Sequence, residues 1–168
     1  MRTLIRLTTI GLVAVGACRD EPGSLVTAPR RTGGTSPVLS LTASEEAPRV
    51  EATITVTAQA TPASGAKAVG SFAGDLRYES SRLSFVGEAR LPSGMRALNP
   101  QPGHIRVAGA AAEGFQDGSL FAVTFKVKDP QGLATIELAL DELSGTDFGN
   151  RLSTNPGDRT VHLRFTRK

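Results

Sequence analysis

The stretch Ser119–Lys128, SLFAVTFKVK, decides the fold class of this chain of 168 residues. Large apolar side chains occupy every second position of it: Phe121, Val123, Phe125 and Val127. Successive side chains of a β-strand point to opposite faces of the sheet, so this period of two predicts a strand with one buried face. The Asp117-Gly118 pair just before it predicts a tight turn.

The same alternation recurs along the chain, between clusters of Pro, Gly, Asn and Asp. It predicts strong strands at 49–59, 134–141 and 160–166, and weaker strands at 38–41, 72–78, 83–86 and 104–110. In the first of these, the apolar set begins at Val50 and continues through Ile54 and Val56. No segment has a convincing helical period. Antiparallel strands with one apolar face each bury that face by stacking in two layers, so we expect an all-β jelly-roll sandwich.

Composition excludes several classes of protein. The chain has 19 Lys and Arg against 16 Asp and Glu, and the loss of Arg2 and Arg6 with a cleaved leader would leave 17 basic residues. This near-balance gives no support for a nucleic-acid partner or for a polybasic membrane patch. A single cysteine cannot form an internal disulfide bond or a thiolate metal cluster.

The N-terminal segment MRTLIRLTTIGLVAVGAC is typical of a bacterial signal peptide, with two arginines before a short apolar stretch. Its end, Val15-Gly16-Ala17-Cys18, resembles a lipobox. The resemblance implies cleavage before Cys18 and lipidation of its sulfur and amine, which would anchor the chain to the bacterial cell envelope through lipid alone. The alternative is an ordinary secretory peptide with a chance cysteine. Arg19 stands where an Asp often retains lipoproteins at the inner membrane, which favours the outer membrane.

The expected organisation has three parts. Residues 1–17 form the signal peptide, and residues 18–35, rich in Pro and Gly and without apolar periodicity, form a flexible tether. Residues 36–168 form one β-sandwich domain.

Three segments of that domain, in order, resemble cohesin domains. They are LRYESSRL at 76–83, GHIRVA at 103–108 and DGSLFAVTFKVK at 117–128, with Ser80 where the family usually has Pro. The resemblance extends over about 36–168. It implies a nine-stranded jelly-roll β-sandwich without catalytic residues. We expect no cofactor and no metal site. It also implies a receptor role, because cohesins bind dockerins, small calcium-binding helical modules, on one outer sheet face; another envelope protein would be the alternative partner of this kind.

Candidate partner-binding residues come from two strands. The resemblance places paired polar positions before Tyr78 at Ser71 and Ala73, and the same strand face continues with Asp75 and Arg77. Ala73 has no polar side-chain atom, so the sequence departs from the family there. On the strand 104–110, the residues themselves point to a contact surface, because small side chains flank an arginine that could anchor a partner. These residues are Arg106, Ala108 and Ala110. Tight packing beneath a crossing loop is the alternative.

The sequence carries no signature of catalysis. No Gly-x-Ser-x-Gly motif is present, and neighbouring carboxylates such as Asp141 and Glu142 point apart in a strand. Each of the two histidines, His104 and His162, precedes an arginine by two residues. The pairs suggest either an anionic-ligand site or two solvated strand faces, and the second is the simpler interpretation. We expect no enzyme, and an envelope hydrolase remains the least favoured hypothesis.

Polysaccharide binding is the main alternative to protein binding, since carbohydrate-binding modules share this fold. Glycan sites commonly use exposed aromatic side chains. The chain has no Trp, and Tyr78 falls on a core position of the cohesin pattern. Phe115, within the loop-like segment 113–117, is the one aromatic residue expected to be exposed.

Overall fold

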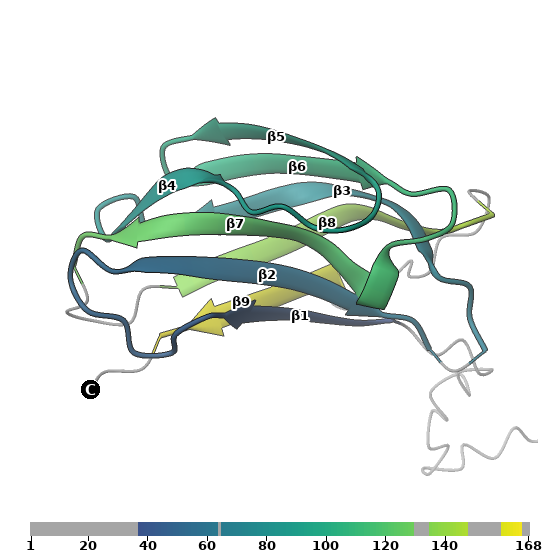
Figure 1. The fold of residues 1–168 in the computed structure, drawn as a ribbon, viewed down its shortest axis with the longest axis horizontal. Coiled ribbons are helices and arrows are strands. Elements are labelled where there is room, and N and C mark those ends of the chain that lie inside the picture. Colours follow the sequence, from purple (N-terminus) through teal and green to yellow (C-terminus); the bar gives the residue numbers. More distant parts are fainter. Residues whose placement is uncertain (1–36, 64, 130–134, 148–158, 166–168) are drawn as a thin grey trace, which may run out of the picture. The chain divides into compact units, whose positions relative to one another are not determined.

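The structure is a computed structural model that describes residues 37–63, 65–129, 135–147 and 159–165. Within these ranges the chain forms nine strands, arranged as two antiparallel sheets (Figure 1). The strands are β1 (Val38–Ala43), β2 (Thr53–Thr61), β3 (Val69–Tyr78), β4 (Leu83–Glu88), β5 (Met95–Gln101), β6 (His104–Ala110), β7 (Ser119–Val127), β8 (Thr135–Gly145) and β9 (Thr160–Arg164). The four-stranded sheet has the order β1-β2-β7-β4, and the five-stranded sheet has the order β5-β6-β3-β8-β9.

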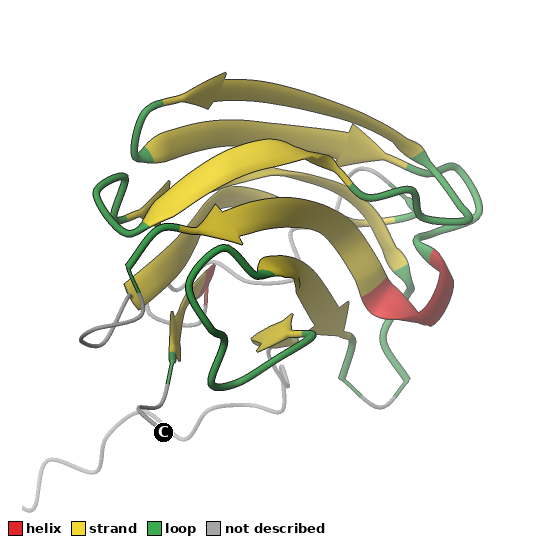
Figure 2. Ribbon diagram, turned by 60° about the vertical axis from the view of Figure 1, so that its left-hand side comes forward, coloured by secondary structure: helices red, strands yellow, loops and turns green. Residues whose placement is uncertain are grey.

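The two sheets stack face to face as a jelly-roll sandwich (Figure 2). The nine-stranded all-β fold expected from the sequence is therefore confirmed. One short 3-10 helix, Gln116–Gly118, leads into β7. Its Asp117 and Gly118 both have positive φ angles, which gives the tight turn that the Asp-Gly pair predicted.

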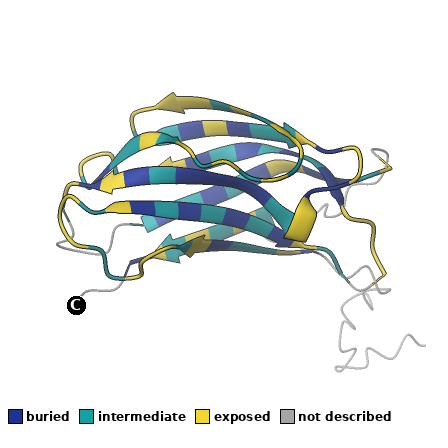
Figure 3. Cartoon of the chain, viewed as in Figure 1, coloured by how far each residue is buried: buried dark blue, intermediate teal, exposed yellow. Residues whose placement is uncertain are grey.

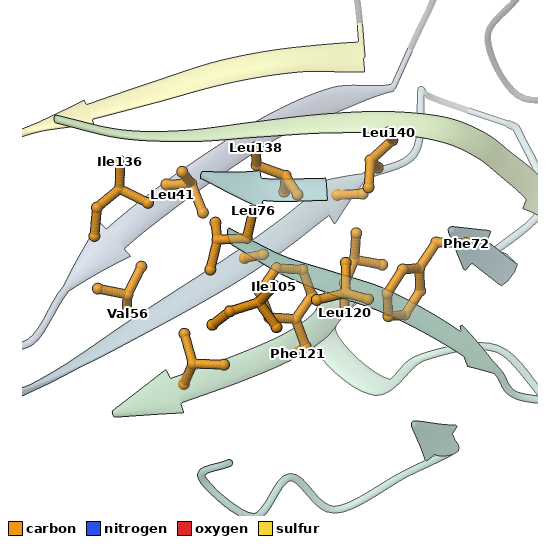
Figure 4. Packing of buried hydrophobic residues seen from close by; sticks show 14 of the residues in the cluster. Leu41, Val56, Phe72, Leu76, Ile105, Leu120, Phe121, Ile136, Leu138 and Leu140 are labelled. Carbon is orange, nitrogen blue, oxygen red and sulfur yellow. The ribbon is translucent and has the colours of Figure 1, made fainter. Parts of the chain in front are cut away.

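The alternation in the sequence becomes an alternation of burial (Figure 3). In β2 the even-numbered residues from Ile54 to Ala60 are buried, and the threonines between them face outward. The inner faces of both sheets supply the core, including Leu76 and Ile105 from one sheet and Val56 and Phe121 from the other (Figure 4). Each large apolar side chain buried in this way contributes about 1.5–3 kcal/mol.

One glycine permits a close approach inside the core. The ring of Phe72 fills the space next to Gly109, where an added Cβ would lie 2.5 Å from Phe72 Cε1. Phe72 in turn packs against Phe115 and Phe121, with ring centroids 5.2 and 5.9 Å away. Gly109 therefore allows an aromatic cluster to fill one end of the sandwich.

The sheet edges differ on the two sides of the sandwich. On one side the edge strands β1 and β9 lie close together, whereas β4 and β5 are the edges on the other side. The pairing of β4 with β7 is interrupted by a register shift between Phe85 and Gly87, and β5 contains Pro100. Bulges and prolines on edge strands hinder the addition of another strand.

Some boundaries differ from the expectation. The strand expected at 49–59 begins only at Thr53, because Glu51 has a left-handed φ of 66° and donates its N–H to the Val127 carbonyl. Val50, expected to face inward, is 53% exposed. Strand β5 was not expected at all.

The expected signal peptide, the tether and Cys18 lie outside the described residues. Among the residues that are described, no helix has the length and apolar character needed to cross a membrane.

Candidate functional site

Strand β3 runs through the middle of the five-stranded sheet and presents a mixed surface to solvent. Its inward positions are held by Phe72 and Leu76, which are buried in the core. Since side chains alternate along a strand, the intervening residues face outward. These are the four predicted on this strand: Ser71, Ala73, Asp75 and Arg77.

The neighbouring strand β6 places the other three predicted residues beside them. Arg106 is opposite Asp75, Ala108 is opposite Ala73, and Ala110 is opposite Ser71. The outer face of the five-stranded sheet therefore gathers all seven candidate residues into one patch. Ala110 is exposed and Ala108 is half-buried, so neither is sealed beneath a loop.

Strand β5 extends this surface with residues that sequence reasoning missed. Ala97 pairs with Ala108, which pairs with Ala73, and Glu142 of β8 follows on the far side. We call Ala97, Ala108 and Ala73 the alanine row. Strands lie about 4.8 Å apart, so the row is about 10 Å long, close to two turns of an α-helix. It forms a flat strip with little side-chain relief.

Two features border the alanine row. Met95, at the exposed edge opposite Ala110, is 78% exposed and adds a large apolar side chain. At the other end, Glu142 accepts a hydrogen bond from the Ser71 hydroxyl at 2.9 Å. In the sequence, only the alternation of Met95 and Ala97 indicated that these two residues share a strand face. Pro100 nearby made a strand there hard to predict.

A charged cluster follows on the other side of the alanine row. The Asp75 carboxylate lies 2.7 Å from His104 Nε2 and 3.0 Å from Arg106 Nη1. The same Arg106 nitrogen lies 2.5 Å from an Asp141 oxygen. Asp141 is brought there by a register shift in the pairing of β8 with β3. Arg106 is thus held between two carboxylates from different strands.

These contacts stabilise the charged form of Asp75. Partial burial alone would raise its pKa, but the hydrogen bond from His104 and the positive charge of Arg106 outweigh that effect. The pKa of Asp75 is therefore lower than the ordinary aspartate value, and the carboxylate is ionised at neutral pH. The hydrogen bond to Asp141 is the main cause that raises the pKa of Arg106.

A second charged group lies beyond the first, towards β9. Glu137 lies 3.9 Å from Arg77 and 3.7 Å from His162 Nδ1. The register places Gln101, His104, Arg77, Glu137 and His162 side by side on five neighbouring strands. We call these five residues the histidine row. Both histidines of the chain therefore lie on one face, a relationship that the sequence did not reveal.

The surface has no arrangement typical of a catalytic site among the residues described. No serine occupies a register position beside His104 or His162. No group of three or more His, Cys, Asp or Glu residues in the described ranges could hold a metal ion. A shallow hollow of about 310 Å³ lies near Tyr78, Phe85 and Pro100, but neither a histidine nor a carboxylate lines it.

Phe115, expected to be exposed, is instead buried at 4% exposure. It packs against Phe72, and the guanidinium of Arg96 lies 5.1 Å from its ring centre. The prediction of an exposed Phe115 was wrong, because Gly114, with a φ of 88°, turns the chain inward just before it. Phe115 is therefore not available as an exposed aromatic contact for a polysaccharide.

Several solved structures with a similar fold are cohesin modules. The cohesin module of a family 33 glycoside hydrolase from Clostridium perfringens is 14% identical, with a TM-score of 0.62 over 79% of this chain and 98% of that one. A type II cohesin in a cohesin–X–dockerin complex from Acetivibrio cellulolyticus is 12% identical, with a TM-score of 0.56 over 71% and 93%. A non-cellulosomal cohesin from Archaeoglobus fulgidus is 23% identical, with a TM-score of 0.51 over 69% and 83%. No protein-family model matches the chain, and no curated protein matches its sequence. The chain has the cohesin fold.

Proposed function

We propose that this protein is a non-enzymatic binding module that recognises a helical protein partner on the outer face of its five-stranded sheet. The partner would be a dockerin-like module. A lipid on Cys18 would anchor the module to the bacterial envelope, with the outer membrane favoured by Arg19. The fold supports the role of a receptor, since the similar structure from Acetivibrio cellulolyticus is described in complex with a dockerin.

The alanine row is the observation that carries this proposal. Small side chains on three adjacent strands let the backbone of a partner helix come close to the sheet, which increases van der Waals contact over the buried area. Met95 supplies an apolar contact at one end, and Glu142 supplies a charge at the other. An apolar centre with a polar rim is the usual anatomy of a protein-binding surface.

The row also explains how the face can bind although Ala73 lacks the polar atom expected in the family pattern. Ala73 is continuous with Ala108 and Ala97, so the departure extends the flat apolar strip. Polar contacts to the partner would instead come from Ser71 and Glu142, near one end of the row, and from Asp75 and Arg106, along one side of it. The partner would therefore contact the centre through apolar side chains and the border through polar ones.

Calorimetry with a panel of dockerin modules tests this proposal. We expect at least one to bind the wild-type domain, and Ala108→Arg to abolish binding because the arginine would stand in the centre of the contact. Thr57→Arg, on the outer face of the opposite sheet, is the matched control and should bind like the wild type. Thermal unfolding checks that both variants are folded. Absence of binding by every dockerin contradicts the partner class, and binding by Ala108→Arg contradicts the face.

A further inference from the structure

The histidine row points to the chemistry of the partner. The chain contains two histidines, and the fold places both on the proposed binding face although 57 residues separate them in the sequence. Their side chains are 39% and 51% exposed, so a docked partner can reach both. Histidine is the side chain whose charge ordinarily changes between pH 5 and 8.

The surroundings of each imidazole are defined by the neighbouring strands. His104 faces Asp75 and Arg77 of β3, shares its own strand with Arg106, and has only the uncharged Gln101 and Asn99 beside it on β5. His162 faces Glu137 of β8 and shares β9 with Arg164. Strand β1, which lies near β9, has no charged residue. Glu79, beyond the end of β3, is already paired with Arg82 at 2.7 Å.

Protonation of the two histidines makes the charge of this surface more positive. Each imidazole lies next to a carboxylate, Asp75 at 2.7 Å and Glu137 at 3.7 Å. A protonated imidazole neutralises the carboxylate beside it, which leaves the neighbouring arginines, Arg106 and Arg77, less compensated. Two positive charges are thus added on the same sheet face as the alanine row, about 13 Å along the strands from it and beyond Asp75 and Arg106. A partner helix that runs along the strands from the alanine row would place acidic side chains next to these charges.

We propose that the histidine row is a proton-dependent contact for acidic side chains of the partner, so that the face binds an acid-flanked helix more tightly at mildly acidic pH. This inference rests on the proposed function and specifies the partner of the same face. An exposed charge pair contributes little alone, so the two together should change the affinity by on the order of tenfold between pH 7.5 and 5.5.

The test is to repeat the calorimetric dockerin panel at pH 7.5 and 5.5 with the wild type and with the double variant His104→Gln/His162→Gln. Glutamine keeps a polar side chain that cannot take the charge. For a dockerin with acidic residues on its contact helix, we expect the wild type to bind about tenfold more tightly at pH 5.5. The double variant should lose most of this difference, and any pH dependence that remains belongs to the dockerin.

The possible failures are distinct. Equal pH dependence in the wild type and the double variant would overturn the inference while leaving the proposed function intact. Absence of binding at both pH values would overturn the two together. NMR of the imidazole side chains in the free protein gives a partner-independent check, because an imidazole that stays neutral at pH 5.5 also overturns the inference.

Discussion

The Arg96 guanidinium lies over the Phe115 ring, 5.1 Å from its centre, and fastens β5 to the opposite sheet. Its Nε donates to the Leu120 carbonyl at 2.5 Å and its Nη2 to the Ser119 carbonyl at 3.1 Å. Ser119 and Leu120 begin β7 of the four-stranded sheet, whereas Arg96 belongs to the five-stranded sheet. Partial burial lowers the pKa of Arg96, and the charge of Glu88 opposes this effect.

Arg96→Ala should therefore destabilise the fold by about 2–3 kcal/mol, because two carbonyls at the start of β7 lose their charged donor. Arg96→Lys should recover only part of this loss, since an ammonium group cannot reproduce the planar fork or stack on Phe115 in the same way. Urea unfolding monitored by circular dichroism measures both. Arg90→Ala, an exposed neighbour, is the control, and an equal effect of Arg90→Ala would contradict the role assigned to Arg96.

Gly109→Ala should destabilise the protein by about 1–3 kcal/mol, because the new Cβ would meet the ring of Phe72 at 2.5 Å. Gly87→Ala is the matched control, since no atom lies within 4 Å of the corresponding Cβ. Thermal unfolding of the two variants under the same conditions compares them. Equal melting temperatures would show that the aromatic cluster yields easily at Gly109.

The stability contributed by Asp75 should depend on pH. Its pKa is lower in the folded chain than in the unfolded chain, so the ionised carboxylate stabilises the fold above the unfolded value of about 4. This contribution is lost as the pH falls below that value and through the folded pKa. Asp75→Asn should therefore be less stable than the wild type at pH 6, and the difference should shrink towards pH 3.

Urea unfolding at several pH values checks this expectation. Glu113→Gln, at an exposed position, should show no such trend. A difference between Asp75→Asn and the wild type that stays constant from pH 6 to pH 3 would mean that the charge of Asp75 does not stabilise the fold.

Cys18→Ser should release the protein from the membrane fraction or stop its processing, because serine cannot carry a thioether-linked lipid. One acyl chain gives marginal membrane attachment, whereas two or three hold a protein stably. Cell fractionation and gel mobility measure the outcome. Ser24→Ala, within the expected tether, should behave like the wild type, and unchanged fractionation of Cys18→Ser would exclude the lipid anchor.

Sequence periodicity predicts the strands whose two faces differ. Strand β7 has Phe121 and Phe125 inside and Thr124 and Lys126 outside, so its pattern is visible without a structure. Strand β5 lies at a sheet edge and is largely exposed, so its apolar and polar residues alternate only weakly. Pro100 within it also argues against a strand, and the sequence therefore did not predict β5. Glu51 delays the start of β2 to Thr53 through a left-handed backbone angle that its side chain does not predict.

The candidate site was predictable only in part for a related reason. Alternation shows which residues share one face of one strand, and on that basis Arg106, Ala108 and Ala110 were placed correctly. It does not show which strands become neighbours. The continuity of Ala97 with Ala108, and of His104 with Glu137, depends on pairings between segments distant in the sequence.

The interrupted edge strands β4 and β5 also limit how copies of this protein can associate. Fibre growth and strand exchange between copies require a long, regular backbone edge that a second molecule can join. Pro100 removes a backbone N–H donor from β5. The register shift between Phe85 and Gly87 makes the backbone of β4 irregular. Copies of this protein would therefore be hindered from joining through β4 or β5, which leaves the outer face of the five-stranded sheet accessible to a partner.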